Sequence, residues 1–246
     1  MWKRIKDIAI KYPKLTSLVT FILFFLSIEY ILKGGWQLAL IISLSLAVHE
    51  YSHVLAMKIY KIPVKGVIFI PFLGAVAIGG TKGKIWTRQQ ECFIALAGPV
   101  MGYLTALPLW LLWKTTDNLL YIYGMGFVIF LNLFNMLPMS PLDGGRVIKS
   151  LLMSISWKYR KIGFFIWGIL VLGSLLLFAK LFLRSSYGIM MMVLLGWFGF
   201  QEIRFEWHYY RAGQMINWPL SKKAIIGFLF AYLVLASWPF LLIVYL

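Results

Sequence analysis

The amino-acid sequence predicts an all-α polytopic membrane protein with about six to seven transmembrane helices and a small membrane-embedded β-hairpin. The first observation is composition: 61% of the 246 residues are hydrophobic and 13% are charged. Soluble domains average about 45–50% apolar and about 25% charged residues, so this chain has too little charge to cover a water-facing surface. The second observation is length, because the apolar stretches reach the roughly 20 residues that a helix needs to cross a bilayer.

Seven stretches are apolar enough to be interpreted as membrane spans. In chain order they cover residues 15–32, 36–57, 92–113, 119–137, 162–183, 187–203 and 224–246. The segments that separate them are all shorter than the roughly 50 residues of an independently folding domain. We therefore expect residues 1–246 to form a single membrane-embedded domain, with an N-terminal anchor helix in 1–35 and additional C-terminal transmembrane helices in 162–246.

Basic residues are distributed unevenly between the two sides of the predicted membrane. If the N-terminus is cytoplasmic, 20 of the 24 Lys and Arg residues lie on the cytoplasmic side, and the other four are Lys33, Lys114, Lys180 and Arg184. Short loops follow the positive-inside rule, so this distribution predicts a cytoplasmic N-terminus. The net charge of +16 then reflects topology, and we expect the chain to interact with a lipid bilayer and with no nucleic acid.

Two of the three histidines occur in the run His49-Glu50-Tyr51-Ser52-His53, inside the apolar stretch 36–57. Residues four apart lie on one face of a helix, so both imidazoles can reach one zinc ion while Glu50 stands beside it as a base. The structural alternative is a polar cluster packed between helices. Each ionisable group inside a span costs about 2.5 kcal/mol or more, so three such groups close together indicate a function.

A catalytic zinc site usually has three protein ligands, and the chain has only eight acidic residues from which to draw the third. Asp143 is the best candidate, because Pro138, Pro141 and the pair Gly144-Gly145 predict a break in the helix beside it. Unwound backbone at membrane depth is tolerated where it lines a cavity. The alternative role for Asp143 is that of a helix N-cap at the membrane surface. The remaining acidic residues lie in interfacial or loop segments, at a span end, or, for Glu29, inside the first span without an evident role: Asp7, Glu29, Glu91, Asp117, Glu202 and Glu206.

Two motifs together resemble the site-2 proteases, which are intramembrane zinc metalloproteases. The first is the His49–His53 run, and the second is Asn135-x-x-Pro138-x-x-x-Leu142-Asp143-Gly144. Residues 66–80 look like the membrane-dipping β-hairpin of that family, and Ala95-Leu-Ala-Gly98-Pro99 looks like the start of its next core helix. The resemblance covers about 36–150, the catalytic core, and is closest to the minimal bacterial branch that resembles sporulation-factor processing proteases. Family members often carry an amide residue three positions after that proline, where this chain has Gly102.

The resemblance implies one zinc ion (Zn2+) per chain, held by His49, His53 and Asp143, with Glu50 as the general acid/base. It also implies that Asn135 contacts the substrate backbone, that the substrate is a membrane-anchored protein, and that a membrane regulatory partner is possible. We expect an integral protein of a bacterial plasma membrane. Because His49 lies eight residues before the inner end of its stretch, about 12 Å of helix rise, the active site should be nearer the cytoplasmic face.

The segment 66–80 alternates in character and contains β-branched residues and glycines, which predicts a hairpin. Its free edge could pair with an extended substrate by strand addition. On this hypothesis the residues that bind substrate are Gly74, Ala75, Val76 and Ala77.

Two alternatives come from other functional classes. A catalytically silent homologue that binds membrane proteins is disfavoured, because every predicted ligand and Glu50 are present. An ion-coupled transporter would be expected to show broken helices in both halves of the chain, and the sequence indicates one broken segment.

Overall fold

The computed structural model describes residues 11–33, 35–70, 74–79, 87–139, 142–154, 160–182 and 219–245, with shorter pieces at 193, 196–197, 199–204 and 207–208. Most of the predicted span 187–203 lies outside the described residues, as do residues 71–73 of the predicted hairpin. The chain divides into two compact units, which are described one at a time. The first contains Met1–Gly83 and Ala97–Asn132, and the second contains Lys84–Leu96 and Leu133–Leu246.

The first unit is built on α2 (Pro13–Ile31) and α3 (Trp36–Ile59), with α5 (Ala106–Thr116) and most of α6 (Leu119–Asn135). Two of its helices coincide closely with the predicted stretches 15–32 and 36–57. The buried residues of α3 recur every three or four positions, which is the period of one helical face. They include Ala39, Ile42, Leu46, His49, His53 and Ala56. The two histidines of the predicted metal-binding run therefore lie on the inner face of α3.

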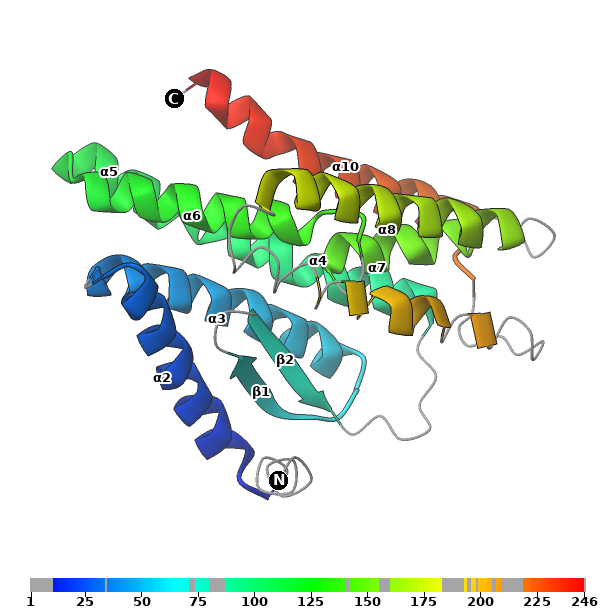
Figure 1. The fold of residues 1–246 in the computed structure, drawn as a ribbon, viewed down its shortest axis with the longest axis horizontal. Helices are drawn as coiled ribbons and strands as arrows, with labels where there is room; N and C mark the ends of the chain where they lie inside the picture. Colours follow the sequence, from blue (N-terminus) through cyan, green and yellow to red (C-terminus); the bar gives the residue numbers. More distant parts are fainter. Residues whose placement is uncertain are drawn as a thin grey trace. The chain divides into compact units, whose positions relative to one another are not determined.

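A two-stranded antiparallel sheet completes the first unit. β1 (Val64–Ile70) pairs with β2 (Gly74–Gly79), with Val67 opposite Ala77 and Phe69 opposite Ala75. The sheet lies beside α2 and α3 (Figure 1). The two paired strands lie largely within the segment 66–80, and the membrane-embedded hairpin expected there stays a prediction.

Hydroxyl groups of α2 cover the outer edge of β1. The backbone N–H of Val67 donates to Ser17 Oγ at 3.0 Å, and that of Phe69 donates to Thr20 Oγ1 at 3.2 Å. Gly66 permits this approach, because a Cβ there would lie 2.9 Å from Ser17 Oγ. The ring of Phe69 packs edge-on against Phe21 at 5.3 Å between centroids. The edge of the sheet that carries no α2 hydroxyl is therefore that of β2.

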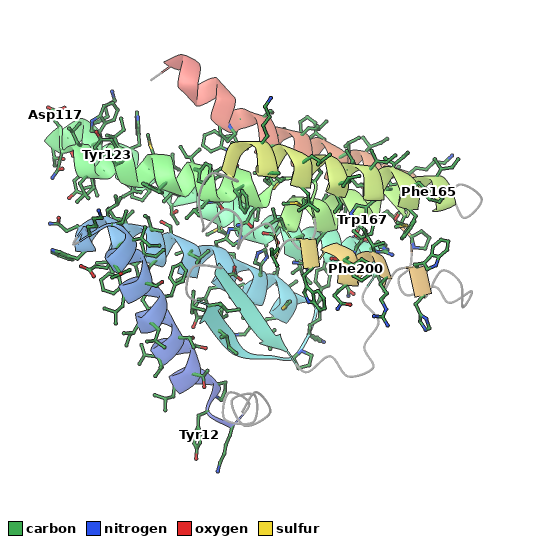
Figure 2. All side chains as sticks on the ribbon, viewed as in Figure 1. Tyr12, Asp117, Tyr123, Phe165, Trp167 and Phe200 are labelled. Atoms are coloured by element: carbon green, nitrogen blue, oxygen red, sulfur yellow. The ribbon has the colours of Figure 1, made fainter. Side chains whose placement is uncertain are left out.

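The second unit contains α7 (Asp143–Leu152), α8 (Arg160–Phe182), α10 (Lys222–Tyr245) and the first half of α4 (Arg88–Leu104). Its core joins α4, α7 and α10 through Ala95, Val147, Leu151 and Tyr232 among others. On α8, Trp167 is fully buried while Phe165, two residues earlier, is 61% exposed (Figure 2). α8 therefore has one packed face and one apolar outer face.

Four helices among the described residues are long and apolar enough to cross a membrane: Pro13–Ile31, Trp36–Ile59, Arg88–Thr116 and Lys222–Pro239. Large apolar side chains on their outer faces are exposed by half or more, as at Leu18 and Phe230. Such surfaces suit lipid, not water. The prediction of a mostly helical membrane protein is confirmed, and the number of six to seven spans stays a prediction.

The structure differs from the sequence expectations in two local details. The stretch 92–113 is interrupted at Thr105 between α4 and α5, which follows from the missing N–H of Pro108 on the next turn. The pair Gly144-Gly145 was expected to break the helix, but both glycines lie in the first turn of α7. The break lies before them, between the end of α6 at Asn135 and the start of α7 at Asp143.

Candidate metal centre

His49 and His53, the imidazole pair, lie one turn apart on the buried face of α3. Their side chains belong to residues that are 3% and 7% exposed. The two Nε2 atoms are 3.1 Å apart and the ring planes are inclined by 78°. Two nitrogens bound to one tetrahedral zinc ion at about 2.0–2.1 Å are about 3.3 Å apart. The spacing of the pair thus fits two ligands of a single zinc ion.

Gly98 keeps the space in front of the imidazole pair open. A Cβ at this position of α4 would lie 2.7 Å from His49 Nε2 and would overlap His53 Nε2. Any larger residue would therefore fill the place at which both nitrogens are directed. The structure gives a reason for the glycine in the sequence Ala97-Gly98-Pro99.

Asn132 of α6 contacts the side of His49 that faces away from the pair. Its Oδ1 lies 2.8 Å from His49 Nδ1, and its Nδ2 donates to the backbone carbonyl of Val128 at 2.8 Å. Asn132 is 3% exposed, so both interactions are shielded from solvent. The sequence analysis assigned no role to Asn132. Its position inside an apolar helix, three residues before Asn135, could have indicated a functional residue.

Asp143 is the first residue of α7 and is 6% exposed. The N-cap of this helix is Leu142, which makes no side-chain capping bond, so Asp143 does not act as the cap. Arg146 Nη1 lies 3.4 Å from Asp143 Oδ1. Each of these three residues, His49 and His53 in the first unit and Asp143 in the second, is buried and offers one atom that can bind a metal.

The described residues just after α6 make local contacts within the second unit. The backbone N–H groups of Met136, Leu137 and Met139 donate to carbonyls two or three residues earlier, and the Met136 carbonyl accepts a 2.8 Å hydrogen bond from the Tyr232 hydroxyl of α10. A Cβ at Gly144 would overlap the same carbonyl. These residues therefore fold back closely onto the first turn of α7.

The other predicted site residues lie on three elements. Glu50 follows His49 on α3 and is half-buried, and Asn135 is the last residue of α6 and also half-buried. The predicted substrate-binding residues Gly74, Ala75, Val76 and Ala77 are consecutive in β2.

A second buried polar group, which we term the ion-pair cluster, consists of Arg88, Glu91, Lys149 and Ser150. One oxygen of Glu91 lies 3.0 Å from Lys149 Nζ, and the other lies 3.1 Å from Arg88 Nη1 and accepts from Ser150 Oγ at 2.8 Å. Lys149 also pairs with Glu202. The sequence analysis placed Glu91 in an interfacial or loop segment, whereas it is a buried residue of the first turn of α4.

Comparison with known proteins gives a consistent result. Residues 37–118 match Peptidase family M50. A candidate zinc metalloprotease of Synechocystis sp. is 30% identical over 195 residues, covering 70% of this chain and 48% of that protein. A zinc metalloprotease of Methanocaldococcus jannaschii is 28% identical over 120 residues, covering 47% of this chain and 34% of that protein. This chain thus spans about half of the length of the first relative and about a third of the second.

One solved structure is similar in fold. A site-2 protease from Methanocaldococcus jannaschii aligns with a TM-score of 0.50 and 26% sequence identity, covering 75% of this chain and 88% of that chain. The imidazole pair, Glu50 and Gly98 all lie inside the range 37–118 that matches the family. Asp143 and the ion-pair cluster residues Lys149 and Ser150 lie beyond it.

Proposed function

Because residues 37–118 carry a Peptidase family M50 domain, the domain of the site-2 proteases, we propose that this chain is an intramembrane zinc metalloprotease. It hydrolyses a peptide bond within or next to a transmembrane segment of a membrane-anchored protein. The observation that carries this proposal is the convergence of two buried imidazole nitrogens, 3.1 Å apart, on a space that Gly98 leaves open. The names of the relatives that match the chain support zinc as the metal.

The proposed site uses one zinc ion per chain, with His49, His53 and Asp143 as its ligands. Two imidazoles and a carboxylate are a common ligand set for catalytic zinc. When bound, the ion supplies Lewis-acid chemistry that polarises the scissile carbonyl and activates water. Glu50, beside His49 on α3, takes the proton from the attacking water and returns it to the leaving amine. Asp143 suits its role because its loop is held by Tyr232 and by close packing at Gly144.

The substrate helix must unwind before its peptide bonds can be attacked, and the edge of β2 offers an extended strand to which it can pair. In an antiparallel pair, residues opposite one another share the direction of their backbone N–H groups. Val67 and Phe69 direct theirs towards α2, so their partners Ala77 and Ala75 direct theirs away from β1. We propose that Gly74–Ala77 bind the unwound substrate at this edge and that Asn135 contacts its backbone.

A proline test addresses the β2 edge directly. Ala75→Pro and Ala77→Pro each remove one outward N–H donor, and we expect cleavage to fall by about tenfold or more because each lost hydrogen bond weakens substrate pairing. Ala75→Val keeps the donor and is the matched control. Full activity of both proline variants would contradict strand addition at this edge.

The topology proposed for this protease follows from its charge distribution. A cytoplasmic N-terminus leaves 20 of the 24 basic residues on the cytoplasmic side. We propose six to seven spans in a bacterial plasma membrane, with the imidazole pair nearer the cytoplasmic face and one membrane-embedded domain in which residues 36–150 form the catalytic core. A membrane regulatory partner could control access to this core.

The function is tested by measuring zinc and cleavage together. Purified wild-type protein in detergent should contain one zinc ion per chain by mass spectrometry and should cleave a model membrane-anchored substrate. Glu50→Gln should keep zinc and lose about 10²–10⁴-fold in rate, because general acid/base catalysis contributes that much. Asp143→Ala should bind zinc more weakly. Absence of zinc from every form, with no cleavage by the wild type, would favour a non-catalytic or transport protein.

A further inference from the structure

We propose that Asn132 is a positioning residue for the zinc ligand His49, and that Gly102 provides the room for its amide. This inference rests on the proposed zinc site. All of the residues that carry it lie in the first compact unit: His49 on α3, Gly98 and Gly102 on α4, and Asn132 on α6. Asn132 fixes which nitrogen of the imidazole is available to the metal.

The two bonds of the amide determine its orientation. A backbone carbonyl can only accept a hydrogen bond, so the group facing the Val128 carbonyl at 2.8 Å is the amide nitrogen of Asn132. The group facing His49 Nδ1 at 2.8 Å is then the amide oxygen. Since this oxygen can only accept, His49 Nδ1 is the donor and carries the hydrogen.

The orientation of the amide places the metal-binding lone pair where the site needs it. A neutral imidazole with hydrogen on Nδ1 has its lone pair on Nε2. Nε2 of His49 is the atom that lies 3.1 Å from His53 Nε2 and faces Gly98. In the opposite tautomer, the same position would present an N–H group, which cannot bind a metal. A hydrogen bond to the distal nitrogen of a ligating histidine commonly sets its tautomer and ring orientation in this way.

Gly102 is required for the amide to reach this position. A Cβ at Gly102 would lie 2.6 Å from Asn132 Cγ and would overlap its Oδ1. Gly98 and Gly102 are four residues apart, so they share one face of α4. Gly98 makes room at the Nε2 atoms, and Gly102 makes room for the amide that orients one of them.

Packing alone does not explain an amide at residue 132. Its neighbours along α6 are apolar, and burying an amide without partners costs free energy. A leucine has the same number and branching of side-chain heavy atoms and would be buried without this cost. The bonds to Val128 and His49 compensate the burial, and of these two only the bond to His49 acts on another helix.

The experiment compares zinc affinity in four variants of the full chain in detergent, by competition with a chromophoric chelator. Asn132→Leu removes the acceptor, Asn132→Asp keeps an acceptor oxygen, and Gly102→Ala places a methyl group on the amide. Thr105→Val is the matched control: it removes a hydroxyl that lies 2.6 Å from the Gly102 carbonyl and 3.3 Å from Ser45 Oγ on α3, and it changes neither the bond between Asn132 and His49 nor the space at the Gly102 Cα. The absorption spectrum of the cobalt-substituted protein reports ligand geometry independently of activity.

We expect the zinc dissociation constant to rise 10–100-fold in Asn132→Leu and Gly102→Ala, as found when partners of metal ligands are removed. In Asn132→Asp the dissociation constant should rise less than in Asn132→Leu, because one oxygen still accepts from Nδ1 although the bond to the Val128 carbonyl is lost. Thr105→Val should not change the dissociation constant. The cobalt spectrum should change in the first two variants only. Should Asn132→Leu not fold, Gly102→Ala tests the same contact.

Two further variants separate this inference from the proposed function. If His49→Ala and His53→Ala lose zinc while Asn132→Leu and Gly102→Ala bind it as tightly as the wild type, the positioning role is wrong and the zinc site stands. If the histidine variants keep zinc with unchanged affinity, the proposed site itself is wrong and the positioning role falls with it.

Discussion

The imidazole pair in the first compact unit and the ion-pair cluster in the second are both buried groups of polar side chains in an apolar chain. In the ion-pair cluster, opposite charges meet. Both oxygens of Glu91 have partners, and Arg88 and Lys149 are balanced by Glu91 and Glu202. In the imidazole pair, two groups of the same kind face one another, and their Nε2 atoms are 3.1 Å apart. The first arrangement brings opposite charges together, and the second brings two imidazole nitrogens to the spacing of two ligands of one zinc ion.

This difference separates a structural role from a functional one. Ionisable residues inside membrane helices are functional candidates by default. Glu91 meets that criterion by position, yet its bonds join the start of α4 to α7 within the second unit. The imidazole pair is better explained by a cation bound to both Nε2 atoms, and Gly98 leaves the space for it. Whether the charges of a buried group compensate one another is therefore a better guide to its role, structural or functional, than burial alone.

Removing a member of the imidazole pair should give the largest effect on function. In His53→Ala we expect zinc to fall from about one per chain to below detection, with loss of cleavage, because a site with two remaining protein ligands binds zinc weakly. The metal-free protein should lose about 0.5–3 kcal/mol of stability, the range typical of single substitutions. Mass spectrometry measures the zinc, and unfolding in the presence of chelator measures the stability. A larger loss of metal-free stability than in Glu91→Gln would reverse the comparison.

Removing the anion of the ion-pair cluster should act on stability instead. Glu91→Gln leaves Arg88 and Lys149 close together without the carboxylate between them, and breaking a buried pair in this way costs about 3–5 kcal/mol. Zinc per folded chain should stay at one. Equilibrium unfolding of the metal-free protein measures the loss of stability. Zinc analysis of the folded fraction measures the zinc content per chain.

A double variant is the control for this prediction. Adding Lys149→Met to Glu91→Gln removes the repulsion between Lys149 and Arg88, but it also takes Glu91 from Arg88 and Lys149 from Glu202. We expect part of the lost stability to return. A Glu91→Gln variant that folds normally but binds no zinc would mean that the ion-pair cluster belongs to the functional site.

Local sequence patterns were enough to predict the helices and the imidazole pair. Apolar length identified α2, α3, α6, α8 and α10 to within a few residues, because a span must hide its backbone from lipid along its whole length. The His49–His53 spacing is set by the helical repeat, so it needs no knowledge of the rest of the fold. The alternation in 66–80 likewise predicted the pairing of β1 with β2. The resemblance to the site-2 proteases is confirmed by the family match and by the similar structure.

Contacts between distant segments could not be predicted in the same way. Asn132 is 83 residues from His49 in sequence, and its role depends on which side of α6 meets α3. Glu91 was assigned outside a helix because hydropathy treats a charged residue as exposed, and only the fold brings Lys149 to it. Gly144 was interpreted as a helix breaker, although its function is to let the Met136 carbonyl approach α7. The third ligand Asp143 and the substrate contacts at β2 stay predictions.

The smallest expected effect concerns a single neutral hydrogen bond in the second unit. Tyr232→Phe removes the 2.8 Å bond to the Met136 carbonyl while keeping the ring in the core. Hydrogen bonds between membrane helices average about 0.6 kcal/mol and reach about 1.7 kcal/mol, so stability should fall within that range. Zinc affinity should fall less than tenfold, because the backbone hydrogen bonds of Met136 and Leu137 to the last turn of α6 and that of Leu142 to Met139 remain. Tyr123→Phe, at a residue that is 61% exposed (Figure 2), is the control and should change neither quantity. If Tyr232→Phe instead lost zinc as completely as His53→Ala, a neutral bond on α10 would control the metal site. The distinction between a structural role for the ion-pair cluster and a functional role for the imidazole pair would then no longer hold.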